Sequence, residues 1–183
     1  MEGITQFNKV HDILDFHVNK NPDRVIVSID NADHKSIDIL SKVSSLVEFL
    51  KEREIKSGDR IAFLAKNSCE FIELMYASSL LELVMVPINF RLAFEEVKFI
   101  IRDSGSKIII FGEEFKEVVE KLNSDKTDLQ LSLEISELGK LLKSKSPVAL
   151  DGPLSSNEAT KTPLFQMYTS GTTGNPKGAL ISQ

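Results

Sequence analysis

The residues with the clearest chemical potential lie near the end of the 183-residue chain, in the run from Tyr168 to Gly178. This run combines hydroxyl side chains and glycines with one cation, Lys177. Glycines let an anion approach the backbone closely, and successive amide N–H groups in such a turn form an anion-binding concavity. The predicted phosphate-binding residues are Thr169, Ser170, Gly171, Thr172, Thr173, Gly174 and Lys177.

Two other interpretations of this run are less consistent with its surroundings. Tracts of Ser, Thr and Gly are most often flexible linkers, but the apolar runs 164–168 and 179–181 predict a tight loop between two buried strands. The phosphate loop of nucleoside triphosphatases requires Gly-Lys followed by Ser or Thr. Because Lys177 lies between Pro176 and Gly178, the sequence disfavours that mechanism.

Together with Ala179-Leu180-Ile181-Ser182, the run resembles the signature phosphate loop of the adenylate-forming (AMP-binding) superfamily, which includes acyl-CoA synthetases and acid-CoA ligases. Earlier stretches that resemble the family occur in the family's order. They are Gly58-Asp59-Arg60, the segment 86–92, and Asp103-Ser104 with Lys107.

The chain departs from the family pattern at three positions. Glu82 stands where the family usually has a glycine that closes a helix, so we expect different local packing there. Many relatives have proline at the position of Phe94 and histidine at the position of Gln183. These departures leave the phosphate-loop pattern intact.

The resemblance implies an ATP-dependent, AMP-forming acid-CoA ligase with ATP, Mg²⁺ and CoA as cofactors. In that reaction a carboxylic acid, such as a fatty acid, attacks the α-phosphate of ATP, and CoA then displaces AMP from the acyl-adenylate. The predicted loop would hold the β- and γ-phosphates. The family's adenine-binding segment, acidic metal ligand and catalytic lysine all follow this loop. We therefore expect an N-terminal part of such a ligase, with no complete catalytic set and no activity alone.

A competing hypothesis is a noncatalytic interaction module, or a subunit that pairs with a separately encoded remainder of a split enzyme. A sheet that ends after Ile181 would leave an edge able to bind another chain or a second copy of this one.

Composition restricts the class of protein. A chain with 42% hydrophobic residues can bury a substantial core, and its net charge of −5 argues against a nucleic-acid-binding surface. One cysteine excludes an internal disulfide. The first residues lack the pattern of a signal peptide, and no apolar run is long enough to cross a membrane. We expect a cytoplasmic protein without a transmembrane segment.

Alternating hydrophobic patterns predict an α/β fold whose mostly parallel sheet is flanked by helices on both faces. The family resemblance makes this an incomplete N-terminal portion of the acyl-CoA synthetase fold. We expect an α/β subdomain at 1–143, a connector at 144–162, and a strand, phosphate loop and strand at 163–183. Helices are predicted near 7–20, 40–50, 70–81 and 93–101, and strands at 24–29, 61–64, 83–87 and 107–111. Ser36 and Asp38 are placed to complement the start of the second helix.

The remaining conspicuous residues are predicted to have ordinary roles, with no metal site. The histidines at 11, 17 and 34 lack metal-ligand spacing, and Cys69 is expected to be a buried core residue. Asn89 and Arg91 are expected to anchor a loop, with substrate contact as the alternative. A solvated helix face is predicted for Glu113, Glu114, Glu117 and Glu120.

Overall fold

The computed structural model describes residues 7–125, 127–142, 162–169 and 176–183. Its helices are α1 (Val10–Lys20), α2 (Ser36–Glu52), α3 (Cys69–Leu81), α4 (Phe94–Ser104), α5 (Lys116–Ser124) and α6 (Ile135–Leu142), with a 3₁₀ turn η1 (Glu113–Phe115). The strands are β1 (Val25–Ile29), β2 (Ala32–Lys35), β3 (Arg60–Leu64), β4 (Val84–Pro87), β5 (Ser106–Phe111), β6 (Leu131–Glu134), β7 (Pro163–Thr169) and β8 (Lys177–Ser182).

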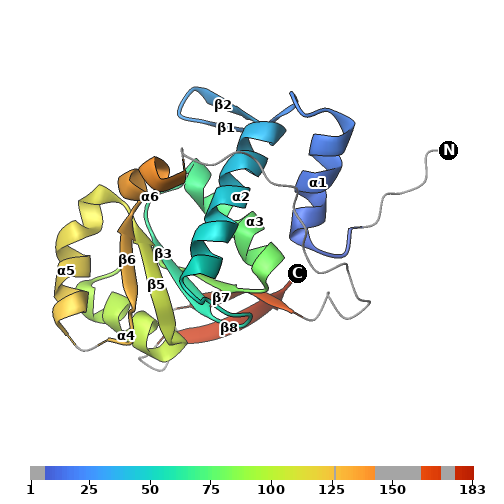
Figure 1. Cartoon of the computed structure of the whole chain (residues 1–183). Coiled ribbons are helices and arrows are strands. Elements are labelled where there is room, and N and C mark those ends of the chain that lie inside the picture. Colours follow the sequence, from blue (N-terminus) through green and yellow to red (C-terminus); the bar gives the residue numbers. More distant parts are fainter. Residues whose placement is uncertain (1–6, 126, 143–161, 170–175) are drawn as a thin grey trace.

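The main sheet has six strands in the order β6-β5-β3-β4-β7-β8 (Figure 1). Each neighbouring pair from β6 to β7 is parallel, and β8 alone pairs antiparallel, with β7. Strands β1 and β2 form a separate antiparallel hairpin. The prediction of a mostly parallel α/β sheet is confirmed.

Successive side chains of a strand point to opposite faces of the sheet. The central strands therefore contribute to two cores, and helices cover both faces. Ile61 and Phe63 of β3 belong to a core shared with α1, α2, α3 and α6. Ala62 and Leu64, between and after them, belong to a second core shared with α4 and α5. A strand buried on both faces must be apolar at every position, which explains the continuous run in β3.

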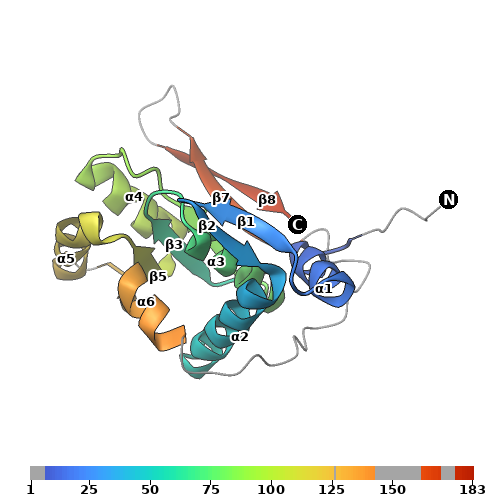
Figure 2. The same cartoon turned by 90° about the horizontal axis from the view of Figure 1, so that it is seen from above.

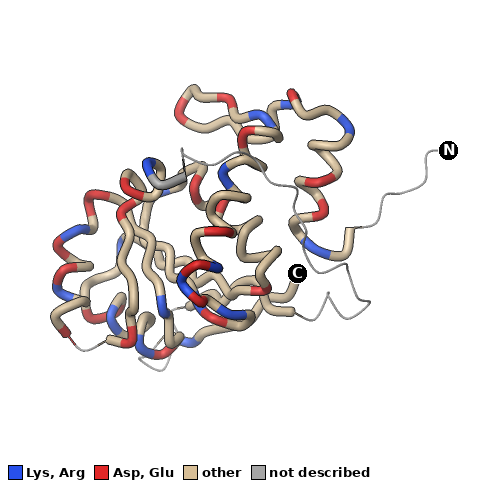
Figure 3. The backbone as a smooth tube through the Cα atoms, viewed as in Figure 1, with Lys and Arg blue, Asp and Glu red and all other residues tan. Residues whose placement is uncertain are grey.

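Charged residues of both signs are interspersed on the outer helices, whereas the central strands carry few of them (Figure 3). This distribution is what a sheet buried between two helical layers requires. Among the described residues, no helix is both long and apolar enough to span a lipid bilayer.

The predicted elements are present, but two strands were missed. β2 reads Ala-Asp-His-Lys and is mostly exposed, so it lacks a hydrophobic signal. β6 is a four-residue strand at the sheet edge. The expected cap was also wrong in detail: Ser36 Oγ donates to the carbonyl oxygens of Asn21 and Pro22, at 3.2 and 2.9 Å, and so ties the start of α2 to the end of α1.

The four glutamates 113, 114, 117 and 120 are all exposed, as predicted. They do not share one helix, because Glu113 and Glu114 lie in η1 and the other two lie in α5. The predicted connector at 144–162 falls outside the described residues apart from Thr162.

Cys69 is buried at the start of α3, as predicted, beside the carboxylate of Glu73. Burial and this carboxylate raise the pKa of the Cys69 thiol to about 12. The thiol is therefore neutral at physiological pH, and the thiolate is the form that reacts with electrophiles.

Alkylation of Cys69 at pH 8 should consequently be on the order of a thousandfold slower in the native chain than in denaturant. Because the chain has a single cysteine, mass spectrometry of iodoacetamide-treated protein reports on this thiol alone. Equal rates in the native and denatured states would contradict the buried environment.

Candidate functional site

The residues that flank the predicted phosphate loop form a hairpin of β7 and β8, at one side of the molecule (Figure 2). Thr169 is the register partner of Lys177, and Tyr168 is the partner of Gly178. Directly opposed residues project from the same face of a pair of strands, so Thr169 and Lys177 share one face. The other predicted loop residues, Ser170, Gly171, Thr172, Thr173 and Gly174, lie outside the described residues.

Both described loop residues, Thr169 and Lys177, are exposed. Among the described residues, no carboxylate forms an ion pair with Lys177. β7 runs parallel to β4, so Thr169 ends a strand at the edge of the sheet where open α/β folds bind ligands. An exposed ammonium group beside a hydroxyl at this position can contact a phosphate.

The prediction that two buried strands flank the loop was half wrong. β7 buries Leu164 and Gln166, but every residue of β8 is exposed. Leu180 and Ile181 are 55% and 48% exposed, since β8 is the edge strand of the sheet. The apolar composition of β8 indicated burial, whereas its position in the sheet leaves it uncovered in this chain.

A chain of polar side chains, which the sequence did not predict, joins the hairpin to the rest of the fold. Tyr168 Oη donates to Asp103 Oδ2 at 2.5 Å and accepts from Gln166 Nε2 at 2.9 Å. Gln166 Oε1 accepts from Arg60 Nε at 3.3 Å, and Arg60 Nη1 donates to the carbonyl of Gly58 at 3.0 Å. Burial, followed by the bond to Asp103, raises the pKa of Tyr168, so its hydroxyl keeps its proton.

Gly178 leaves room for these side chains where they lie against β8. A Cβ atom at this position would lie 2.7 Å from Gln166 Nε2 and 3.0 Å from Tyr168 Cζ. Glycine therefore lets the two side chains lie against the facing strand, next to Lys177.

The polar chain also connects stretches that the family pattern singled out separately. Gly58 and Arg60 come from one stretch and Asp103 from another. Lys107 Nζ donates to Asp59 Oδ2 at 2.9 Å, which joins the same two stretches a second time. The resemblance to the family picked out both stretches in the sequence, but it did not indicate that they contact each other.

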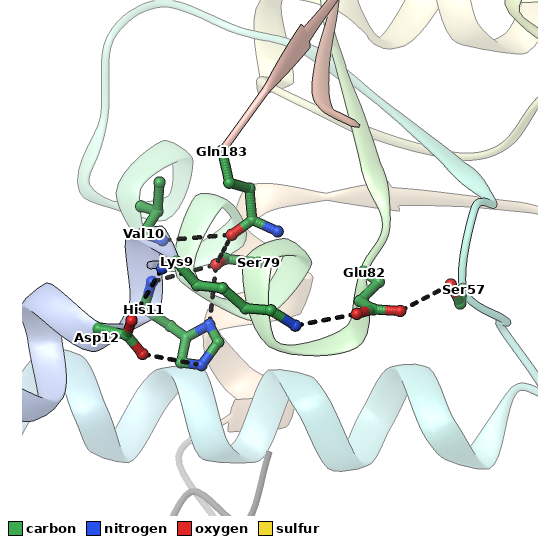
Figure 4. Close-up of polar contacts among 8 residues, drawn as sticks. All are labelled: Lys9, Val10, His11, Asp12, Ser57, Ser79, Glu82 and Gln183. Carbon is green, nitrogen blue, oxygen red and sulfur yellow. Dashed lines mark hydrogen bonds and ion pairs between the residues drawn. The ribbon is translucent and has the colours of Figure 1, made fainter. Parts of the chain in front are cut away.

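Glu82 takes the glycine-like conformation without being glycine. It ends α3 in the left-handed region, with φ 55° and ψ 38°. Its carboxylate accepts from Lys9 Nζ at 2.9 Å and from Ser57 Oγ at 3.2 Å, and Lys9 lowers its pKa (Figure 4). α3 therefore ends in the left-handed turn that a glycine would form, although this conformation is strained for glutamate. The Glu82 side chain also forms an ion pair with Lys9 of the N-terminal segment.

Gln183, the second departure from the family pattern, ties the end of β8 to α1 and α3 (Figure 4). Its Oε1 accepts from the Val10 amide at 3.3 Å and from Ser79 Oγ. Ser79 Oγ also accepts from the His11 amide at 3.1 Å and lies 2.9 Å from His11 Nδ1. Ser79 Oγ thus lies between Gln183 and His11, and His11 Nε2 lies 3.6 Å from Asp12 Oδ1.

This network predicts a pH-dependent contribution to stability. Burial lowers the pKa of His11 below 6.5. The unfolded chain therefore binds the proton more readily, and stability present above about pH 6.5 should fall as the pH decreases. His11→Asn keeps a polar group beside Ser79 but cannot titrate, so its free energy of unfolding should vary less between pH 7 and 5.

Urea unfolding at a series of pH values measures this difference. His34→Asn, at a half-buried histidine of β2, is the matched control and should follow the wild-type profile. A His11→Asn profile parallel to that of the wild type would contradict the assignment.

The other candidate residues have structural positions. Asn89 Oδ1 accepts from the Arg91 amide at 3.0 Å, which closes a turn after β4 as predicted for Asn89. Arg91 contributes only its backbone amide to this bond, and its guanidinium lies over the Phe90 ring. Within the described ranges, no group of three or more His, Cys, Asp or Glu side chains could hold a metal ion. Two open pockets of about 690 Å³ lie on the helical layers, and neither is lined by a residue of β7 or β8.

The chain belongs to the AMP-binding enzyme family, because the model of that family matches residues 14–183. It is 40% identical over 126 residues to the long-chain-fatty-acid–CoA ligase FadD13 of Mycobacterium tuberculosis, covering 69% of this chain and 25% of that protein. It is 30% identical over 168 residues to the fatty acid–[acyl-carrier-protein] ligase ScoC of Streptomyces coeruleorubidus, covering 91% and 31%.

The structural comparison leads to the same family. An inhibitor-bound N-terminal domain of FACL13 from Mycobacterium tuberculosis aligns with a TM-score of 0.82 and 31% identity, over 96% of this chain and 44% of that one. The fold is that of the N-terminal domain of acyl-CoA synthetases. The chain spans less than a third of the two curated relatives named above.

Proposed function

We propose that this chain is the N-terminal part of an ATP-dependent, AMP-forming acid-CoA ligase that activates a carboxylic acid, of which a fatty acid is the favoured example. The observation that carries the proposal is the β7–β8 hairpin, which presents Lys177 and Thr169 together and exposed within the family's signature run. Similarity to a long-chain-fatty-acid–CoA ligase supports the acid and the acceptor thiol.

In this proposal the hairpin binds the β- and γ-phosphates of ATP. The Lys177 ammonium offsets negative charge that develops on the departing pyrophosphate, and the Thr169 hydroxyl donates to a phosphate oxygen. A fixed arrangement of donors gains most because it needs no reorganisation during the reaction. Magnesium would further neutralise the phosphates, but the described residues offer no metal cluster, so we assign no Mg²⁺ ligand to this chain.

Ligand-induced stabilisation tests the phosphate-binding part of the proposal. Pyrophosphate or MgATP at ten times its Kd should stabilise the folded chain by about 1.4 kcal/mol. The measurement is the unfolding midpoint by differential scanning fluorimetry. No stabilisation at millimolar ligand would contradict phosphate binding by this chain.

Catalytic competence needs a separate test. We expect no acyl hydroxamate from the isolated chain with ATP, fatty acids and hydroxylamine. Turnover near 1 per second would contradict the proposal that catalytic groups lie beyond these residues.

The exposed apolar residues of β8 favour one alternative, a subunit that pairs with a separately encoded remainder. Light scattering across a range of concentrations, with and without the missing part of the ligase, separates the two functions. Strictly monomeric behaviour without complementation would argue against the paired form.

A further inference from the structure

The register pairing that joins the β7–β8 hairpin to the rest of the sheet is short. In the described residues, the register pairing between β4 and β7 consists of Met85 opposite Phe165. β8 pairs with β7 alone. Thr169 and Lys177 lie at the far end of the hairpin, four residues along β7 from that pair, where side-chain contacts can help to set the direction of the strands.

Asp103 provides such a contact from a position that does not favour the helix itself. It is the residue before the last in α4, where the negative end of the helix dipole disfavours a carboxylate. Its Oδ2 accepts a hydrogen bond from Tyr168 Oη at 2.5 Å, and this bond joins α4 to β7. This bond to a charged acceptor is of the stronger class.

The contact acts on the face of the hairpin opposite to that of Thr169 and Lys177. Tyr168 packs against the core formed with α4 and α5, and Gly178 lies beneath its ring. Thr169 and Lys177 are the adjacent residues of the two strands, so they project from the opposite face. Anchoring through Tyr168 can thus fix the hairpin without occupying the ligand face.

We propose that Tyr168, held between Asp103 of α4 and Gln166 of β7, is a positioning residue that sets the direction of the hairpin for phosphate binding by Thr169 and Lys177. This inference rests on the proposed function for the identity of its ligand. The contact between Tyr168 and Asp103 does not depend on that function.

Tyr168→Phe in the 183-residue chain is the direct test, since it removes the hydroxyl and keeps the ring over Gly178. We expect its affinity for pyrophosphate to fall roughly fivefold by isothermal titration calorimetry, which is less than for loss of a direct contact because the lost hydrogen bond positions the hairpin and does not touch the ligand. Amide hydrogen exchange within β8 should accelerate, and exchange within β3 and β5 should not. Asp103→Ala should have the same effects, and the double variant should be no worse than either single variant.

Tyr76→Phe is the matched control, because Tyr76 is the only other tyrosine and is buried in α3. It should leave pyrophosphate affinity and β8 exchange unchanged. Asp103→Asn, which keeps an acceptor for Tyr168, should restore most of the affinity lost in Asp103→Ala.

The outcomes separate this inference from the proposed function. Faster exchange in β8 with unchanged pyrophosphate affinity would overturn it, because the contact would then be structural only. Additive losses in the double variant would also overturn it. If the wild type fails to bind pyrophosphate, the proposed function fails, and unchanged exchange in Tyr168→Phe would reject the anchoring contact independently.

Discussion

Replacing Lys177 by alanine should weaken the binding of pyrophosphate and MgATP by about tenfold to a hundredfold, since a charge-assisted hydrogen bond is worth roughly 1.5–3 kcal/mol. Lys177 is exposed at the start of β8, so its removal should not change the free energy of unfolding appreciably. Titration calorimetry with the wild type and the variant measures the difference.

The control for this experiment is Lys116→Ala, which removes an exposed lysine from α5. It should bind pyrophosphate with wild-type affinity at fixed ionic strength. Lys177→Arg keeps the charge but should retain only part of the affinity, because a larger, planar guanidinium cannot take the place of a compact ammonium group without a change in geometry. Identical affinities for wild type and Lys177→Ala would remove the support for the phosphate role.

The largest effect on stability should come from Lys42→Met. Lys42 Nζ donates to Glu73 Oε1 at 2.8 Å, and the Glu73 side chain is only 2% exposed while that of Lys42 is 39% exposed. Removing the lysine leaves a buried carboxylate without its cation, which should cost about 3–5 kcal/mol. Urea unfolding at pH 7.5 measures the loss.

Two further variants test the cause of that loss. Lys42→Met combined with Glu73→Leu should be more stable than Lys42→Met alone, because the buried charge is gone. Lys66→Met breaks an exposed pair with Glu114 and should cost at most about 1 kcal/mol. Equal losses for Lys42→Met and Lys66→Met would contradict this account.

Most of the sheet could be predicted because its strands are buried on both faces and therefore apolar throughout. β3 and β5 have this pattern. Of the helices between them, α4 has its buried residues at helical spacing, whereas α3 is largely apolar. β2 could not be predicted, because a hairpin strand on the surface needs no hydrophobic residues. The exposure of β8 was not predictable either, since composition does not reveal which strand lies at an edge.

The sequence identifies a candidate site, but it does not indicate the contacts that support that site. Hydroxyls, glycines and Lys177 in one short run indicate phosphate binding whatever their environment. The bonds among Arg60, Gln166, Tyr168 and Asp103 join residues up to 106 positions apart, and only the fold brings them together. Short-range patterns carry no record of such contacts.

The left-handed turn at Glu82 has a consequence for how this chain can diverge. A glycine there would adopt the same turn without strain. It would also remove the carboxylate that pairs with the buried ammonium group of Lys9. Substitution at one position should therefore be accompanied by substitution at the other. Natural variants with glycine at 82 are expected to carry an uncharged residue at 9. The N-terminal segment and the α3–β4 junction should therefore covary in sequence.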